Sequence, residues 1–272
     1  MSEVVEVYDV DDPRLADFRD LAVADRRPDR PGGRGLVIAE GVVVVRRLLG
    51  SPYPPRAMFG VRAKVVQVAS DTEVPCYVGS AELMTQVVGF HLNRGVLATA
   101  DRAPVPSALD LIARARHVAV LEGVGDHENL GGLFRNAAAL GVGGVLLGPR
   151  CADPLYRRSV RVSMGHVLRV PFAPLNHWPG SLDQLRAAGF VIAALTPAED
   201  AVPLPCARVD LGLGSGSGTG RVAWLLGAEG PGLSAEALAA ADMAVRIPMT
   251  QGVDSLNVAT AAAIAFATVR NP

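Results

Sequence analysis

The chain has 272 residues, of which 50% are hydrophobic and 19% charged, and its formal net charge is −1. This composition is typical of a globular protein, and the length allows one large domain or two modest ones. The longest apolar runs, at 41–45 and 261–267, are too short for a membrane helix of roughly 20 residues. Because the acidic start of the sequence also lacks a basic leader, we expect a cytoplasmic protein.

The three cysteines are Cys76, Cys151 and Cys206, which lie far apart and form no C-x-x-C pair. No histidine stands at metal-ligand spacing from them, so the sequence predicts neither a disulfide framework nor a metal site. We interpret all three as small buried hydrophobic side chains.

The first hundred residues predict a small α/β domain. Residues 27–35 are rich in proline and glycine and predict a loop. The pattern then predicts a helix at 39–50, strands at 57–61, 65–69 and 74–79, and a helix at 80–88. The character of the sequence changes at Pro104 and Pro106. We place an N-terminal domain at 1–102, a linker at 103–114 and a second domain at 115–272.

Basic residues are concentrated in two stretches. Residues 20–65 carry nine basic and four acidic side chains, and residues 150–169 carry five arginines and one acidic residue. Two basic stretches in a nearly neutral chain favour a polyanionic substrate. A solvated surface explains either stretch equally well.

The second domain alternates apolar strands with helices. Strands are predicted at 117–124, 143–148, 167–172, 190–195, 221–227 and 243–249, and helices near 130–140, 153–163, 180–188, 234–241 and 255–269. This order predicts an α/β domain with a mostly parallel sheet covered on both faces. The glycine-serine run at 211–220 predicts a flexible surface loop.

The residues after the apolar runs are candidate site residues, because ligands of open α/β sheets bind beyond the carboxyl ends of the strands. In the first cluster, 128–137, we expect Asn129 to cap a helix. The buried face of this helix would consist of Leu130, Leu133, Phe134, Ala137 and Leu140. The opposite face would carry Gly131, Gly132, Arg135 and Ala139. Glycines beside a cation suggest close approach by a ligand or by a second backbone. The alternative is a glycine-rich turn with an exposed arginine.

Two further clusters follow later strands. Residues 225–234 place Glu229 among three glycines, without the pattern of a P-loop or of a dinucleotide fold. The alternative for Glu229 is a buried carboxylate that accepts backbone N–H groups. Residues 247–263 predict an alanine-rich helix from Ser255 that another element could approach closely. No structural reason is evident for the polar residue Asn257 in the first turn of this helix.

Together, the three clusters resemble the motifs of the SpoU/TrmH family of the SPOUT class. The first has Asn129, Gly131 and Arg135, the second Gly227, Glu229 and Gly232, and the third residues 247–249 and 255–258. The segment 161–165 also resembles the family's R-x-S-x-G. The resemblance covers about residues 115–270. Many members read D-P-x-N before the first motif, whereas this chain reads G-D-H-E-N at 125–129.

This resemblance implies an S-adenosylmethionine-dependent RNA 2'-O-ribose methyltransferase. It also implies a homodimer with the active site at the interface, and a C-terminal SPOUT domain with a deep trefoil knot. No metal is needed. On this resemblance the cofactor would contact Leu195, Thr196, Leu226, Gly227, Ile247, Met249 and Leu256. The catalytic residues would be Arg135, Asn129, Glu229, Ser255 and Asn257.

The N-terminal domain resembles, more loosely, the ribosomal-protein-like substrate-binding domain of many members. We predict RNA contacts at Arg26, Arg27, Arg30, Arg34, Arg157, Arg158 and Arg161. Arg135 would activate the ribose hydroxyl as a base or hold the RNA phosphate beside it. We favour the second role, because the very high pKa of a guanidinium means that it is almost never neutral.

Two other functions compete with this interpretation. One is an RNA-binding or ribosome-assembly protein that keeps the fold without turnover, and the other is a nucleotide-binding α/β enzyme that acts on small molecules. The absence of a phosphate-binding loop motif argues against the nucleotide-binding enzyme. The sequence does not choose between ribosomal and transfer RNA.

Overall fold

The computed structural model describes residues 3–21, 35–208, 210–212 and 220–268. The chain divides into two compact units. The first comprises Met1–Pro104 and Leu155–Arg169, and the second comprises Val105–Pro154 and Val170–Pro272. Among the described residues, no helix has the length and apolar character needed to cross a membrane.

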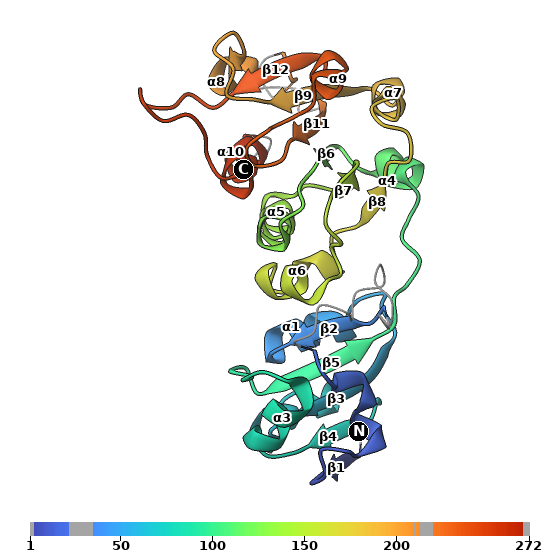
Figure 1. The fold of residues 1–272 in the computed structure, drawn as a ribbon. Coiled ribbons are helices and arrows are strands. Elements are labelled where there is room, and N and C mark those ends of the chain that lie inside the picture. Colours follow the sequence, from blue (N-terminus) through green and yellow to red (C-terminus); the bar gives the residue numbers. More distant parts are fainter. Residues whose placement is uncertain (1–2, 22–34, 209, 213–219, 269–272) are drawn as a thin grey trace. The chain divides into compact units, whose positions relative to one another are not determined.

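The first unit is built on a five-stranded mixed sheet (Figure 1). Its strand order is β1 (Val4–Glu6), β4 (Cys76–Val78), β3 (Pro55–Gly60), β5 (Val96–Ala100) and β2 (Val37–Glu40). The helices of this unit are η1 (Pro13–Phe18), α1 (Val42–Leu49), α2 (Arg62–Val65), η3 (Ala69–Asp71) and α3 (Ala81–Val88). Strands β1, β4 and β3 run parallel, whereas β5 is antiparallel to both β3 and β2.

A segment from the middle of the chain also belongs to the first unit. It contains α6 (Arg157–Val162) and η4 (His166–Leu168). The Arg157 guanidinium stacks 4.4 Å from the Phe90 ring centroid and lies 3.5 Å from the Glu40 carboxylate. Arg47 donates a hydrogen bond to the Met164 carbonyl. The R-x-S-x-G segment at 161–165 therefore packs on the N-terminal sheet, although we assigned it to the second domain.

The second unit is built on a seven-stranded sheet in which every pairing is parallel. Its order is β10 (Val202–Pro203), β12 (Met243–Arg246), β9 (Phe190–Leu195), β11 (Arg221–Leu226), β6 (His117–Leu121), β7 (Gly144–Leu147) and β8 (Phe172–Pro174). The helices are α4 (Ala108–Arg114), α5 (His127–Leu140), α7 (Leu182–Ala187), α8 (Leu204–Ala207), α9 (Ala235–Ala239) and α10 (Val258–Ala267). This confirms the predicted α/β class with a mostly parallel sheet.

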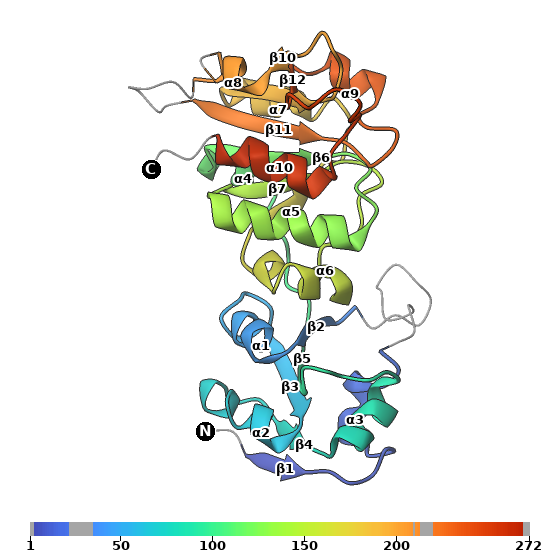
Figure 2. The ribbon, with the colours of Figure 1, turned by 90° about the vertical axis from the view of Figure 1, so that its left-hand side faces the viewer.

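Helices cover both faces of this sheet. One face carries α4, α7 and α9, whose apolar side chains form a single core with Val120, Ile192 and Leu225 of the central strands. The other face carries α5 and α10, which lie side by side (Figure 2). Because both faces are buried, the strands are almost continuously apolar, which explains why they are recognisable in the sequence as apolar runs.

Short polar side chains set where several helices begin. Ser80, Ser107 and Ser234 each accept a backbone N–H three residues further on, at α3, α4 and α9. This interaction satisfies one of the N–H groups that a helix leaves unpaired at its start. Gly141 ends α5 in the left-handed region, with φ of 74°, where glycine carries no steric penalty.

Three of the differences from the predicted elements concern the second half of the predicted linker and the runs predicted as strands at 65–69 and 167–172. Residues 65–69 are not a strand but the end of α2 and the start of η3. Val65 and Val68 are buried and Val66 is exposed, which is helical and not strand spacing. Residues 166–168 form η4, and the strand predicted at 167–172 begins only at Phe172. The second half of the predicted linker at 103–114 forms α4, because Leu111 and Ile112 are buried against the sheet.

Candidate functional site

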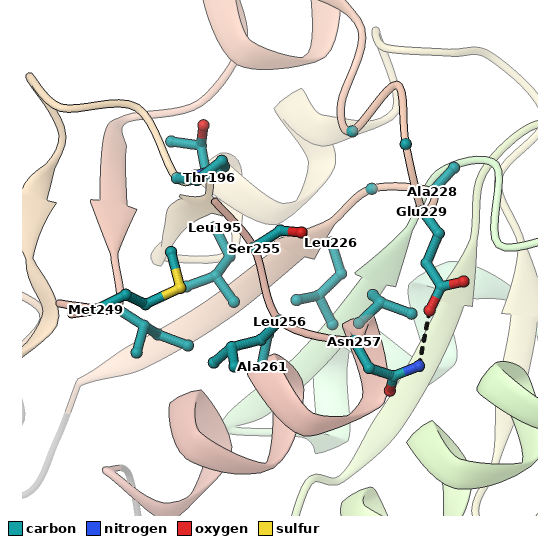
Figure 3. Close-up of a pocket in the computed structure, with 16 residues that line it drawn as sticks. Leu195, Thr196, Leu226, Ala228, Glu229, Met249, Ser255, Leu256, Asn257 and Ala261 are labelled. Carbon is teal, nitrogen blue, oxygen red and sulfur yellow. Dashed lines mark hydrogen bonds between the residues drawn. The ribbon is translucent and has the colours of Figure 1, made fainter. Parts of the chain in front are cut away.

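A pocket of about 430 Å³ lies at the carboxyl ends of β9, β11 and β12 (Figure 3). Its walls are the loop after β9, the loop after β11, two residues that follow β12, and the segment that leads into α10. This is the edge at which open parallel sheets bind ligands, because the loops there converge between neighbouring strands.

All seven residues predicted to contact a cofactor line this pocket, as do three of the five predicted catalytic residues. The seven are Leu195, Thr196, Leu226, Gly227, Ile247, Met249 and Leu256, and the three are Glu229, Ser255 and Asn257. Six other lining residues were not predicted as site residues: Pro197, Ala228, Gly230, Gly232, Val258 and Ala261. Each lies within five residues of a predicted site residue. Predicting every residue of these segments as a site residue would therefore have included them. The roles of these residues stay predictions.

Three polar side chains of the separate motifs are joined by hydrogen bonds. The Nδ2 group of Asn257 donates to Asn129 Oδ1 and to Glu229 Oε1, with both distances 2.7 Å. Figure 3 shows the bond to Glu229 at the edge of the pocket. The three motifs therefore meet at one point, between α5, the loop after β11 and the start of α10.

Two predicted roles at this point need correction. Asn129 does not cap α5, because Asp126 accepts the N–H groups of Glu128 and Asn129 at 2.8 and 2.9 Å. Asn257 does have a structural reason, since its Oδ1 accepts the Ala259 N–H at 3.0 Å and caps α10. Helix α10 accordingly begins at Val258 and not at 255.

The glycine face of α5 accommodates the neighbouring helix. A Cβ atom on Gly132 would lie 3.0 Å from the Cβ of Ala259 in α10. Asn136, one turn further, donates to the Ala259 carbonyl at 2.7 Å. Close approach of a second backbone is therefore the correct reason for Gly132. Gly131 is buried, contrary to its predicted place on the opposite face.

The loop after β11 needs its glycines for a tight turn. A Cβ atom on Gly227 would lie 2.3 Å from the backbone carbon of Gly232. Gly230 and Gly232 have φ values of 87° and 69°, which other residues rarely adopt. Glu229 at the tip is exposed, so the alternative of a buried carboxylate is wrong for it.

Arg135 lies on α5 but does not line the pocket. Its side chain is exposed and makes no hydrogen bond or ion pair with any described residue. It stands six residues after Asn129, which places it about 9 Å further along the helix axis. The cation predicted to act on the substrate is thus separate from the cavity of its own chain.

The structure describes only three of the arginines predicted to bind RNA. Arg26, Arg27, Arg30 and Arg34 lie outside the described residues. On α6, Arg158 is exposed and Arg161 is half-buried. Burial lowers the pKa of Arg157, and the nearby charge of Glu40 opposes this effect. The Arg157 guanidinium stacks on Phe90, which holds the side chain within the first unit. Arg158 is the best exposed of the three.

Comparisons with known proteins agree with this geometry. The model of the SpoU rRNA Methylase family matches residues 116–267. A tRNA/rRNA methyltransferase of Mycobacterium tuberculosis, named as uncharacterized, is 55% identical over 267 residues, which cover 97% of this chain and 91% of the relative. A 23S rRNA (guanosine-2'-O-)-methyltransferase of Acinetobacter baylyi is 27% identical over 208 residues, which cover 75% and 81%.

A solved structure resembles nearly the whole chain. The AdoMet-bound rRNA methyltransferase of Sinorhizobium meliloti superposes with a TM-score of 0.78 at 25% identity, covering 98% of this chain and 97% of that one. The family model covers more than half of the chain, and the matched residues contain the pocket and all three motifs. The chain therefore belongs to the SpoU rRNA Methylase family.

Proposed function

We propose that the protein transfers a methyl group from S-adenosylmethionine to a ribose 2'-hydroxyl of rRNA or tRNA. The observation that carries this proposal is the hydrogen-bonded group of Asn129, Asn257 and Glu229 at the edge of the pocket. The A. baylyi relative, whose name states guanosine-2'-O-methylation of 23S rRNA, supports the choice of reaction.

The pocket suits S-adenosylmethionine, which the S. meliloti relative contains. Its volume falls within the range of roughly 300–1,000 Å³ that is usual for small-molecule sites. Leu195, Ile247, Met249 and Leu256 supply apolar walls, and the glycines after β11 leave backbone groups accessible. When bound, this cofactor supplies an electrophilic methyl group on a sulfonium.

The polar residues at the pocket edge orient the nucleophile. A ribose hydroxyl is a weak nucleophile and must give up its proton as it attacks. Both N–H bonds of the Asn257 amide are already used, so Asn257 holds Asn129 and Glu229 in place. Glu229 Oε2 accepts no hydrogen bond from a described residue and is free to accept one from the hydroxyl. Ser255 lies in the wall of the same pocket.

Arg135 holds the RNA phosphate beside the reacting hydroxyl. Arginine carries a permanent positive charge, and its planar fork matches phosphate oxygens. Because Arg135 does not line the pocket of its own chain, we assign it to the site of a second protomer in a homodimer.

The trefoil knot stays a prediction, since the order of the strands does not by itself establish that the chain is threaded through a loop.

The test of the assigned roles is Arg135→Ala. We expect methyl transfer to RNA to fall at least 100-fold, in the range seen when a positioned charge is lost, while the Kd for S-adenosylmethionine stays within twofold. Transfer is measured with labelled cofactor, and the Kd by calorimetry. Arg114→Ala removes another exposed arginine of the same unit and serves as the control.

Two outcomes would decide against the proposal. Wild-type transfer by Arg135→Ala would remove the assigned role of the arginine. A wild-type protein that binds RNA without binding S-adenosylmethionine would favour the RNA-binding or ribosome-assembly alternative. Ribose-methylation mapping of total RNA, with and without the gene, identifies the RNA and the nucleotide.

A further inference from the structure

A buried carboxylate that the mechanism does not use lies beside the pocket. Glu122 directly follows β6, and 2% of its side chain is exposed. Most acidic side chains are exposed, and a buried one is retained only where partners compensate for the loss of water. The contacts of Glu122 therefore show what this side chain does.

Each oxygen of the Glu122 carboxylate accepts a hydrogen bond from a different loop. Oε1 accepts the indole N–H of Trp178, and Oε2 accepts the backbone N–H of Ser234, both at 2.9 Å. The Arg150 guanidinium lies 3.6 Å from Oε1, and the Arg150 side chain is 72% exposed. Trp178 precedes α7, and Ser234 caps α9.

The backbone of the same residue contacts the other end of the pocket loop. The Glu122 N–H donates to the Leu226 carbonyl at 2.9 Å. Leu226 ends β11 and Ser234 begins the cap of α9, so the intervening residues 227–233 are held at both ends by Glu122. This segment contributes Gly227, Ala228, Glu229, Gly230 and Gly232 to the pocket.

We propose that Glu122 is a positioning residue that clamps the loop 227–233 in the shape that binds the cofactor and presents Glu229 to the substrate. It touches neither ligand and acts through Ser234 and Leu226. The inference rests on the proposed function, because its main readout is the affinity for S-adenosylmethionine.

The first variant is Glu122→Gln, which keeps the shape but replaces one oxygen by an NH₂ group. Both oxygens face donors, so the amide must turn its NH₂ toward either Trp178 or Ser234 and lose that bond. We expect the Kd for S-adenosylmethionine to rise about tenfold, as the loss of one buried, charge-assisted hydrogen bond predicts. Calorimetry measures the Kd, and thermal unfolding measures stability in parallel.

Two matched variants separate positioning from general destabilisation. Asp242→Asn makes the same chemical change in a carboxylate that bridges Arg186 and the Ile192 N–H, both at 2.9 Å, at the amino end of β12. It should lower the melting temperature and leave the Kd within twofold. Trp178→Phe removes the donor to Oε1 while leaving Ser234 paired, and it should likewise keep the Kd.

The double variant provides the sharpest test. In Trp178→Phe with Glu122→Gln, the NH₂ group can occupy the side that the indole N–H vacated, and the remaining oxygen can accept from Ser234. We therefore expect the double variant to bind S-adenosylmethionine more tightly than Glu122→Gln alone. If Glu122 did not act on the Kd through its bond to Ser234, the effects of the two substitutions on the Kd would be independent and would add, and the double variant would bind no more tightly than Glu122→Gln.

Three results would overturn the inference. The first is a Kd of Glu122→Gln for S-adenosylmethionine within twofold of wild type. The second is an equal rise of the Kd in Asp242→Asn, and the third is a double variant that binds S-adenosylmethionine no more tightly than Glu122→Gln. If Glu122→Gln does not fold, Glu122→Asp, whose shorter side chain withdraws from Ser234, is measured against the same criteria. Failure of the wild-type protein to bind S-adenosylmethionine would instead count against the proposed function.

Discussion

The side chain of Asn257 uses all of its hydrogen-bonding capacity. Its two N–H bonds go to Asn129 and Glu229, and its oxygen accepts the N–H groups of Ala259 and Thr260. A satisfied amide has one preferred orientation, because any rotation breaks several bonds at once. One residue thus begins a helix and fixes two residues of the pocket edge.

At the other end of the sheet, His117 predicts a pH dependence of stability. Burial, together with the positive charge of Arg116, lowers the pKa of His117 to about 4, and its Nδ1 has no hydrogen-bond partner among the described residues. The unfolded chain takes up a proton near pH 6.5, whereas the folded chain does so only near pH 4. Stability therefore falls as the pH drops from about 6.5 to 4.

Thermal unfolding at pH 7 and pH 5 checks this expectation. The melting temperature of the wild-type protein should fall more between these values than that of His117→Asn, which has no group that titrates there. Equal slopes for the two proteins would mean that other groups cause the acid sensitivity.

At the scale of elements, the packing of α5 against α10 places the motif residues. Gly132 and Ala259 allow the two helices to approach closely, and Ala262 and Ala265 of α10 are fully buried. Asn129 stands in the first turn of α5 and Asn257 at the cap of α10. Because the helices are close, these two short side chains can reach each other.

Gly132→Val should therefore weaken both stability and cofactor binding. The added side chain would press on Ala259 and move α10, at a cost of about 1–3 kcal/mol for overpacking. Separation of Asn257 from Asn129 would then raise the Kd for S-adenosylmethionine. Urea unfolding and calorimetry measure the two effects.

Ala139→Val is the matched control, since Ala139 is exposed on the same helix. It should cost less than about 1 kcal/mol, through helix propensity alone. If the two variants were equally stable, close packing at Gly132 would not be the reason for this glycine.

At the scale of the whole molecule, one chain holds the pocket while its candidate phosphate-binding arginine does not line it. The proposed homodimer resolves this separation if each Arg135 serves the pocket of the partner. A closed dimer with two-fold symmetry then contains two equivalent composite sites.

Heterodimers of two inactive variants test this arrangement. Arg135→Ala and Glu229→Ala, carrying different tags, are co-expressed and the mixed dimer is purified through both tags. One site of that dimer would combine an intact pocket with an intact arginine, so about half of the wild-type activity should return. An arginine that acts within its own chain would restore none.

Local sequence patterns predicted much of the second unit. The strand β9 lies at 190–195 as predicted, and the other central strands differ by a few residues at their ends. These strands are buried on both faces, so their apolar character does not depend on their order in the sheet. In the first unit, β1, β2 and β5 were not predicted. Residues 65–69 were assigned wrongly, because a short apolar run fits a strand or a helix equally well.

The sequence by itself determined the fold class and the three motifs, because each of these depends on residue types at short spacing. The family resemblance of those motifs then indicated ten of the residues that line the pocket. Only the tertiary structure decided that Asn257 joins Asn129 to Glu229, that Asp126 and not Asn129 caps α5, and that Glu122 holds the loop after β11. The Asn129–Asn257 bond spans 128 residues and the Glu122–Ser234 bond spans 112. Such partners are selected by the order of strands and the closeness of helices, which act through packing across the whole unit.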